Sequence, residues 1–487
     1  MILGSSETGP NGPSIRLSAG RIFRSPIPNA ALRPRSTGPR SSGSACGSCR
    51  FVVDASTMPP VSAPSEQYQI FVMASSWSAP RRSIIFASMA SPPSGQTGRM
   101  TMLNSSGLTA MLAAALLAAP AMAGTYVSKV VATGLNNPRG LAFGPDGALY
   151  IAEAGYYLAG GPVAITPRGP AGYSETGSIT RLSGGTQVRI LSGLPSIALT
   201  NGTDVSGPND IVFTPDGIGH VVVGLGMDPT FRTTELSPEG GNLGKVYSFS
   251  PGPFTPIGDI SAYELAHNPV GGALDTNPFH AAAIGNNLLV TDAGSNTLLK
   301  LDRETGVVSL VAAFPGRFIG PPPPYSDSVI TGVAVGPDGN YYVSELTGFP
   351  FTEGAARIYQ VTPGGDVSIA YEGFTMISDI AFGADGSLYV LEVDSNGLAT
   401  EGGTGQIIRI RPGGKQSNVI SGLVMPTGLE VGGNGKLYVT NFSAMPGIGQ
   451  VLAISYVPEP ASWAMMIAGF GLVGTMARRR RARSVSA

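Results

Sequence analysis

The sequence predicts an all-β protein in which residues 124–457 form a six-bladed β-propeller. A hairpin pattern recurs six times in this region: an apolar strand, a turn of the Gly-x-Asp-Gly type, and a second apolar strand that ends, in most copies, in an acid. The turns follow one another roughly every 50 to 70 residues, a spacing typical of propeller blades with loops of variable length. A separate strand at the start of the region can complete the last blade and so close the ring.

Each copy of the pattern is a β-hairpin, because Asp-Gly and Asn-Gly tolerate the positive φ of a tight turn. The first copy runs from Gly140 to Glu153. The turn residues are Asp146, Asp216, Asn286, Asp338, Asp385 and Asn434. A third strand follows each hairpin, over residues 178–182, 245–249, 298–301, 357–361, 407–410 and 451–454.

The fourth strands explain how the ring closes. Five copies have one, at residues 187–191, 256–260, 307–311, 367–371 and 416–420. The sixth copy runs into the C-terminal tail without one, whereas residues 126–132 resemble the other fourth strands. We therefore expect residues 126–132 to pair with residues 451–455 and to complete the last blade.

The C-terminal residues 458–487 combine three features of a sorting signal. These are Pro458, Glu459 and Pro460, an uncharged apolar segment over residues 461–477, and Arg478, Arg479, Arg480 and Arg481. The apolar segment is at the short end of what spans a bilayer as a helix, and the arginines favour a cytoplasmic end. This order resembles the PEP-CTERM tail, which a membrane protease of the exosortase type removes. The resemblance implies a single transmembrane helix, with exosortase and the secretion machinery as partners; an ordinary tail anchor is the alternative.

The N-terminal flank predicts a signal peptide over residues 100–123. An apolar run over residues 108–119 leads to Ala121 and Ala123, which fit an Ala-x-Ala cleavage site before Gly124. We interpret residues 1–99, rich in Ser, Pro and Arg, as an artefact of an upstream start codon; a genuine disordered extension is the alternative. The predicted product is exported, anchored transiently in the membrane, and then periplasmic, at the cell surface or extracellular.

The composition limits the chemistry and the partners. Cys46 and Cys49 both lie in residues 1–99, so we expect neither a disulfide nor a thiol nucleophile in the propeller. Residues 124–457 carry about 12 more acidic than basic side chains. This charge disfavours nucleic acid and anionic lipid as partners. We expect a monomer that binds no nucleic acid.

Two stretches of the propeller region carry a family resemblance. They are Asn-Pro-Arg-Gly-Leu-Ala-Phe-Gly-Pro-Asp-Gly at residues 137–147, and Asn-Pro-Phe-His-Ala at residues 277–281 with Leu-Val-Thr-Asp-Ala-Gly following. Together they resemble the ScyD/ScyE family, a set of NHL-like propellers associated with scytonemin pigment clusters and widespread as PEP-CTERM proteins. The resemblance covers residues 124–456 and implies the fold, but it implies no particular chemistry.

The candidate site residues are expected on one face of the propeller. First-strand starts and second-strand ends meet there, because the two strands form one hairpin. The candidate metal ligands, at second-strand ends, are Glu153, Asp292, Glu345, Glu392 and Asn441. Such oxygen ligands suit a hard cation, so Ca²⁺ is the candidate cofactor. The candidate ligand-binding residues, at first-strand starts, are Arg139, Asp210, His280 and Asp379.

Two functions fit this face. The first is a non-enzymatic binding or scaffold protein of the envelope or extracellular matrix, with a polysaccharide or another envelope protein as partner. The second is a divalent-cation-dependent hydrolase or lyase, because the propeller resembles those of gluconolactonase-type enzymes. That resemblance implies that the ion polarises a carbonyl, that Glu153 or Asp292 activates water, and that His280 moves a proton, with Arg139 a further catalytic candidate.

The recurrence of the acids favours the first function. A residue that returns in every blade fits a structural role, such as accepting hydrogen bonds from the backbone of the next loop, whereas a catalytic residue is expected once. The two interpretations predict different geometries. Metal ligands converge on one point, whereas structural acids each turn into their own blade.

Overall fold

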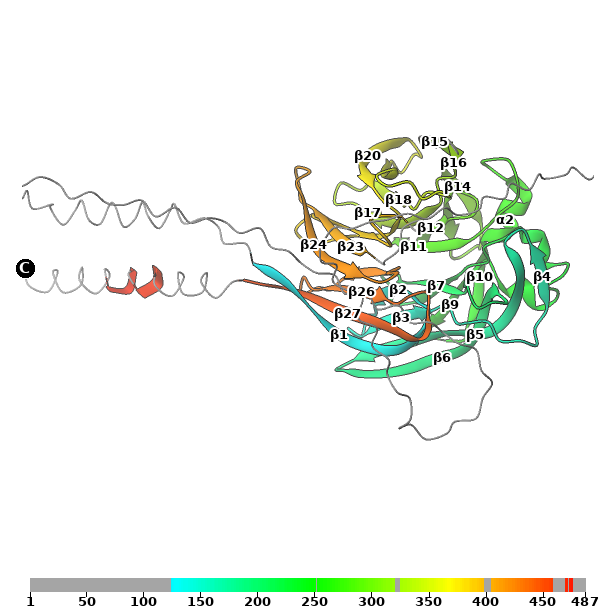
Figure 1. Ribbon diagram of the computed structural model, residues 1–487, viewed down its shortest axis with the longest axis horizontal. Helices are drawn as coiled ribbons and strands as arrows, with labels where there is room; N and C mark the ends of the chain where they lie inside the picture. Colours follow the sequence, from blue (N-terminus) through cyan, green and yellow to red (C-terminus); the bar gives the residue numbers. More distant parts are fainter. Residues whose placement is uncertain are drawn as a thin grey trace, which may run out of the picture. The chain divides into compact units, whose positions relative to one another are not determined.

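The computed structural model describes residues 124–250, 252–319, 325–397, 404–458, 469–471 and 473–475. Within them the chain forms six antiparallel sheets of four or five strands, together with one two-stranded sheet. The innermost strands contact one another in order around a complete ring, and the last blade contacts the first. The predicted six-bladed propeller is thereby confirmed (Figure 1).

The first three blades follow the N-terminal strand β1 (Thr125–Asn136). Blade 1 contains β2 (Pro138–Phe143), β3 (Leu149–Glu153), β5 (Gly169–Ser183) and β6 (Thr186–Leu199), with β4 (Val163–Thr166) paired to β5. Blade 2 contains β7 (Pro208–Phe213), β8 (Gly219–Val223), β9 (Lys245–Ser250) and β10 (Thr255–Asp259), with the 3₁₀ helices η1 (Pro229–Arg232) and η2 (Glu239–Asn242) between β8 and β9. Helix α2 (Ile260–His267) leads to blade 3, which contains β11 (Pro278–Ile284), β12 (Asn287–Asp292), β13 (Thr297–Asp302) and β14 (Val308–Ala313).

The two-stranded sheet of β15 (Arg317–Phe318) and β16 (Tyr325–Ser326) precedes the last three blades. Blade 4 contains β17 (Ile330–Val335), β18 (Tyr341–Glu345), β19 (Ala356–Val361) and β20 (Val367–Phe374). Blade 5 contains β21 (Ile377–Phe382), β22 (Leu388–Glu392), β23 (Gly405–Ile410) and β24 (Gln416–Leu423). Blade 6 contains β25 (Leu429–Val431), β26 (Leu437–Asn441) and β27 (Pro446–Val457), with β1 as its outer strand.

The ring closes as the strand count predicted. Strand β1 pairs antiparallel with β27 from Thr125 opposite Val457 to Ala132 opposite Val451 and beyond. The first and last strands of the domain therefore lie side by side, in cyan and red in Figure 1. This pairing covers the outer edge of β27, which would otherwise offer a long row of unpaired backbone groups.

Five of the six hairpin turns combine a left-handed glycine with an aspartate or asparagine whose side chain accepts a hydrogen bond from the backbone. In blade 1, Gly147 has a φ of 72° and Asp146 Oδ1 accepts a hydrogen bond from the Ala148 N–H at 3.1 Å. Arg181 on β5 then pairs with Asp146 Oδ2 at 2.6 Å, which fastens the turn to the third strand. Residues that recur in the sequence pattern thus serve the geometry of each blade.

Aromatic side chains pack in the seams between neighbouring blades. Tyr150 of blade 1 meets Phe213 of blade 2 edge to face, with ring centroids 4.8 Å apart. Phe143 of blade 1 meets Tyr438 of blade 6 in the same way at 5.2 Å. These contacts make the tyrosines of the second strands part of the core, where each ring buries a large apolar area.

One strand is shorter than predicted, and several expectations fall on residues outside the described ranges. The strand predicted at residues 256–260 ends at Asp259, because Asp259 Oδ1 accepts a hydrogen bond from the Ala262 N–H at 2.9 Å and caps helix α2. No helix within the described residues is long and apolar enough to span a bilayer. Of residues 461–477, only 469–471 and 473–475 are described, and both are helical. Residues 1–99, the predicted signal peptide at 100–123, Cys46 and Cys49 lie outside the described residues.

Candidate functional site

The innermost strands of the six blades share one sequence frame around the central channel. Position one holds Pro138, Pro208, Pro278, Ile330, Ile377 and Pro426. Position two holds Arg139, Asn209, Phe279, Thr331, Ser378 and Thr427, and position three holds Gly140, Asp210, His280, Gly332, Asp379 and Gly428. Each innermost strand pairs on one side only, so backbone groups along its other edge need partners from elsewhere.

Position two usually supplies such a partner to the next blade. In four blades its short polar side chain donates a hydrogen bond to the position-one carbonyl of the following blade. The contacts are Asn209 Nδ2 to Pro278 O (2.9 Å), Thr331 Oγ1 to Ile377 O (2.8 Å), Ser378 Oγ to Pro426 O (3.3 Å) and Thr427 Oγ1 to Pro138 O (2.9 Å). We call these four contacts the inter-blade stitches. Their recurrence identifies a structural role.

Blades 1 and 3 depart from this rule, because position two is Arg139 in one and Phe279 in the other. Arg139 extends to the Val205 carbonyl, with its Nη2 2.6 Å away, and Phe279 has no side-chain donor. Between blades 3 and 4 the cross-blade contact comes instead from Thr291 Oγ1 of β12, which donates to the carbonyl of Thr331, at position two rather than position one. Arg139 and Phe279 both line the same pocket.

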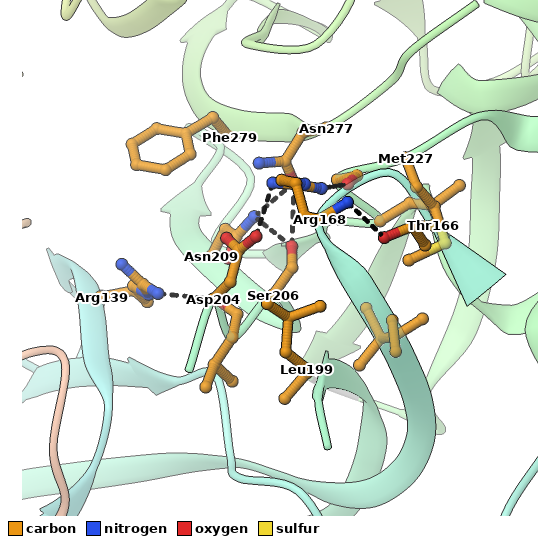
Figure 2. Close-up of a pocket in the computed structure, with 16 residues that line it drawn as sticks. Arg139, Thr166, Arg168, Leu199, Asp204, Ser206, Asn209, Met227, Asn277 and Phe279 are labelled. Atoms are coloured by element: carbon orange, nitrogen blue, oxygen red, sulfur yellow. Dashed lines mark hydrogen bonds and ion pairs between the residues drawn. The ribbon is translucent and has the colours of Figure 1, made fainter. Parts of the chain in front are cut away.

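That pocket, which we call the upper pocket, has a volume of about 140 Å³ and lies between the innermost strands of blades 1 to 3 and the β4–β5 hairpin (Figure 2). Its polar lining residues are Arg139, Thr166, Arg168, Asp204, Ser206, Asn209 and Asn277. Phe279 forms an aromatic part of the wall. Ser206 Oγ donates to Asn277 Oδ1 at 2.9 Å, and Asn209 Nδ2 lies 3.4 Å from the same oxygen, so Asn277 is held in one orientation with its amide group toward the others.

The upper pocket carries more positive than negative charge. Arg168 Nη1 forms an ion pair with Asp204 Oδ2 at 2.6 Å, and both side chains are partly exposed. Arg139 has no carboxylate partner among the described residues, and its buried Nε has no hydrogen-bond acceptor there. Burial lowers the pKa of Arg139 to about 10, against the opposing attraction of Asp204. Arg139 therefore stays charged at neutral pH, and its charge is only partly compensated.

The channel narrows at position three, where three side chains form what we call the Asp–His–Asp bridge. His280 Nε2 lies 3.1 Å from Asp379 Oδ1 and 3.5 Å from Asp210 Oδ2. Each aspartate also joins the next blade, because Asp210 Oδ2 accepts from the Ala281 N–H at 2.8 Å and Asp379 Oδ2 accepts from the Leu429 N–H at 2.7 Å. Burial opposes a charge on His280, but the two carboxylates outweigh it and raise the pKa of His280 to about 10.

Glycine occupies position three in the other blades because the neighbouring blade leaves no room there for a side chain. A Cβ on Gly140 would lie 1.8 Å from Asp210 Oδ1, and one on Gly428 would lie 2.2 Å from the Arg139 carbonyl oxygen. Any side chain at these positions would force the backbone or the bridge to move. The bridge and the glycines thus form one unit across the channel.

The structure does not bring the five predicted metal ligands together in a ring; each hydrogen-bonds to its own blade and to the chain segments beside it. Glu153 is a clear case, because its Oε2 accepts from the Asn136 N–H at 2.7 Å and its Oε1 from Thr180 Oγ1 at 2.6 Å, and Arg189 pairs with it at 2.6 Å. Asp292 Oδ1 accepts from the backbone N–H of Asn277 at 2.6 Å and from the two N–H groups that follow the strand.

The other three candidate ligands repeat this arrangement. Glu345 accepts from the Tyr359 hydroxyl, Glu392 from the Thr375 N–H and Gln406, and Asn441 from the Val424 N–H. Burial raises the pKa values of Asp292, Glu345 and Glu392. In the described part of the chain no group of three or more His, Cys, Asp or Glu side chains is arranged to hold a metal ion. Most of the carboxylate oxygens that Ca²⁺ would need are already engaged by hydrogen bonds or ion pairs within the protein.

The remaining predicted residues lie in two places. His280, Asp210 and Asp379, from blades 3, 2 and 5, meet in the bridge across the channel, whereas Arg139 turns away from them into the upper pocket. Sequence reasoning missed Phe279 and Glu430 as site residues. Both could have been found by aligning the six copies, since each breaks the residue type that its position otherwise holds.

Comparison with known proteins gives a sorting motif and a set of distant folds. Residues 457–481 match the PEP-CTERM protein-sorting motif. No curated protein sequence matches the chain. Among solved structures, a gluconolactonase from Xanthomonas campestris is 9% identical over 68% of this chain and 89% of its own, with a TM-score of 0.42. The PQQ-bound aldose sugar dehydrogenase from Streptomyces coelicolor is 14% identical over 69% and 99%, with a TM-score of 0.39.

A third structure, the PQQ domain of pyranose dehydrogenase from Coprinopsis cinerea, is 11% identical over 68% of this chain and 95% of its own, with a TM-score of 0.38. Similarities this low assign neither a ligand nor an activity. The sorting motif, in contrast, is specific. It implies that the protein is exported, anchored in the membrane for sorting and processed by exosortase.

Proposed function

We propose that the exported propeller is a binding protein of the cell envelope or extracellular matrix, and that the upper pocket takes a carboxylate-bearing sugar unit of an extracellular polysaccharide. The observation that carries the proposal is that two blades have an unusual residue at position two. Four blades use a short polar residue there for an inter-blade stitch, whereas Arg139 and Phe279 give up the stitch and line one pocket.

The chemistry of the pocket fits an acidic sugar. A guanidinium group that lacks a carboxylate partner is complementary to a ligand carboxylate, which it can bind through paired hydrogen bonds. Phe279 supplies an aromatic wall for the less polar face of a sugar ring. The volume of about 140 Å³ is close to the ~150 Å³ of an engineered cavity that holds a benzene-sized ligand, so the pocket suits one six-membered ring.

The hydrolase alternative receives no support from the residues that it requires. Glu153 and Asp292 were the candidates for activating water, and both are fully buried with their oxygens engaged by hydrogen bonds from their own blades and from the chain segments beside them. A general base must reach the water that it deprotonates. We therefore propose the binding function and not the hydrolase function.

The ScyD/ScyE resemblance is consistent with this proposal, and we propose membership of that family and a monomeric state. The Asn-Pro-Phe-His-Ala stretch that carries much of the resemblance contains Asn277, Phe279 and His280. Two of these residues line the upper pocket and the third forms the bridge. The family pattern therefore coincides with the channel rather than with the outer strands.

The test is a calorimetric titration of residues 124–458 with tri-galacturonic acid and with its reduced, uncharged counterpart. We expect binding of the acid, little binding of the neutral sugar, and a loss of about 10- to 100-fold in affinity for Arg139→Gln, because a hydrogen bond to a charged group is worth ~1.5–3 kcal/mol. Arg181→Gln is the matched control, since Arg181 lies on β5 and pairs with Asp146 of a hairpin turn, away from the pocket. Equal affinity of Arg139→Gln and wild type, or preference for the neutral sugar, would overturn the proposal.

A further inference from the structure

The channel contains a second cavity on the other side of the Asp–His–Asp bridge, which we call the lower chamber. It has a volume of about 330 Å³ and is lined by the innermost strands of all six blades. Position five of the frame lines it in most blades, and this position holds Ala142, Val212, Ala282, Ala334, Ala381 and Glu430. Small apolar side chains thus leave the cavity open, and one carboxyl group stands among them.

The charges around the lower chamber do not balance. Asp210, Asp379 and Glu430 supply three carboxyl groups, and His280 supplies one cation. Burial raises the pKa of Glu430 to about 8, with further increases from Asp379 and Asp210, while His280 and the Phe143 N–H act in the opposite sense. Glu430 therefore either holds a proton or needs a cation beside it near neutral pH.

A buried acceptor of the bridge, beside the chamber, also lacks a partner. Asp210 is 1% exposed, and its Oδ1 has no hydrogen-bond partner among the described residues. This oxygen lies in front of Gly140, directly before the part of β2 that lines the chamber. His280 also lines the chamber. Buried polar atoms of this kind are expected to have a partner, and a ligand is one source of it.

We propose that the lower chamber is a second binding site, which takes a small primary alkylammonium ion with its charged end against Glu430 and the bridge and its alkyl chain among the position-five residues. The ammonium group has three donors, and the Glu430 carboxylate in the chamber wall supplies acceptors for them. The apolar walls match a short alkyl chain rather than a strongly hydrated metal ion. The site is separate from the upper pocket and does not depend on the function proposed there.

The first test is the thermal unfolding of residues 124–458 with n-butylammonium chloride, compared with equal concentrations of sodium chloride and of butan-1-ol. A rise in Tm of about 2 °C is expected at ten times the dissociation constant of the amine, and none with the salt or the alcohol. Calorimetry supplies a second measurement, the pH dependence of the affinity for the amine. A Glu430 with only a structural role would not produce this dependence. The affinity should rise about tenfold between pH 7 and pH 9, because the ammonium ion must displace the proton of Glu430.

Two variants separate the charge from the cavity. Glu430→Gln removes the carboxylate and Ala381→Leu fills the chamber, and each should abolish the rise in Tm and the pH dependence. Glu304→Gln, at an exposed position, should keep both. Unchanged binding by Glu430→Gln, or a Tm of the wild type that does not respond to the amine at pH 9, would overturn the proposal. Because Ala381→Leu keeps every charge, a folding failure of Glu430→Gln alone would still leave the test decisive.

Discussion

The acids at the ends of the second strands and the side chains around the channel show opposite behaviour. Glu153, Asp292 and their equivalents recur in nearly every blade, are buried, and have hydrogen-bond donors from their own blade. Arg139 and Glu430 occur once each, face cavities, and carry charges that their surroundings leave partly uncompensated. In a repeat protein, the residues that break the repeat are therefore better candidates for binding than those that make it.

The Asp–His–Asp bridge combines both kinds of residue, because its aspartates have a recurrent structural role and its histidine occurs only once. Asp210 and Asp379 each accept an N–H from the next blade, which is a structural task that recurs. His280 occurs once and ties the two aspartates together across the channel. Two aspartates, each of which accepts an N–H from the next blade, and a single histidine thus separate the channel into two cavities of opposite charge.

The largest expected effect comes from removing β1, on which the recurrent architecture depends. A chain that begins at Leu135 lacks most of the strand that pairs with β27. It should be insoluble or fail to fold, because the edge of β27 is then exposed. Circular dichroism and sedimentation of the shortened protein check this, with residues 124–458 as the reference. A shortened chain that melts like the reference would contradict the closure.

The next effect concerns a recurrent acid. Asp292→Ala removes the acceptor of several buried backbone N–H groups and of Thr276. We expect a loss of about 3–5 kcal/mol in the free energy of unfolding, since unsatisfied buried donors are costly. Urea unfolding measures the loss. Calcium should leave the stability of both proteins unchanged; a calcium-dependent rise that Asp292→Ala removes would reinstate the metal site.

The bridge should give a smaller effect that depends on pH. The pKa of His280 is raised from 6.5 to about 10, so its contribution to stability is complete below pH 6.5 and is lost as the pH rises toward 10. His280→Gln should therefore destabilise the protein by about 3 kcal/mol at pH 6, where two buried carboxylates lose their cation. Urea unfolding at several pH values should show the difference between the two proteins shrinking toward pH 10. A difference that grows with pH would contradict the bridge.

The smallest effect belongs to a single stitch. Thr331→Val keeps the shape of the side chain but removes the donor to the Ile377 carbonyl. A loss of about 1 kcal/mol is expected, which is typical of one buried neutral hydrogen bond. Thermal and urea unfolding measure it, and the affinity of the upper pocket for tri-galacturonic acid should not change. A loss of affinity without a loss of stability would mean that the stitches belong to the binding site.

Much of the fold could be predicted from the sequence, because the same strand and turn pattern recurs in each blade. Five fourth strands and one orphan strand at residues 126–132 left a single way to complete blade 6. The orientation of the side chains could not be predicted in the same way. Register shifts interrupt the first hairpins between Pro138 and Leu141 and between Pro278 and His280, and such irregularities redirect the neighbouring side chains.

The limits of the sequence are clearest at the two cavities. Arg168 and Asp204 lie on the β4–β5 hairpin and on a loop outside the repeat, so no alignment of the six copies places them beside Arg139. Glu430 lies within the repeat and is the one charged residue at a position that otherwise holds Ala or Val. Its environment depends on Asp210 and Asp379, which are far away in the sequence and adjacent only in the closed ring.

The central claim is that residues which recur stabilise the propeller, whereas residues which occur once bind its ligand. Arg139→Gln and Thr427→Val test it most directly, since both change position two and only Thr427 makes a stitch. Stability by urea unfolding and affinity for tri-galacturonic acid are measured on the same two variants. We predict that Arg139→Gln loses affinity and keeps its stability within about 1 kcal/mol, whereas Thr427→Val loses about 1 kcal/mol of stability and keeps its affinity. Equal losses of affinity in both variants would contradict the account.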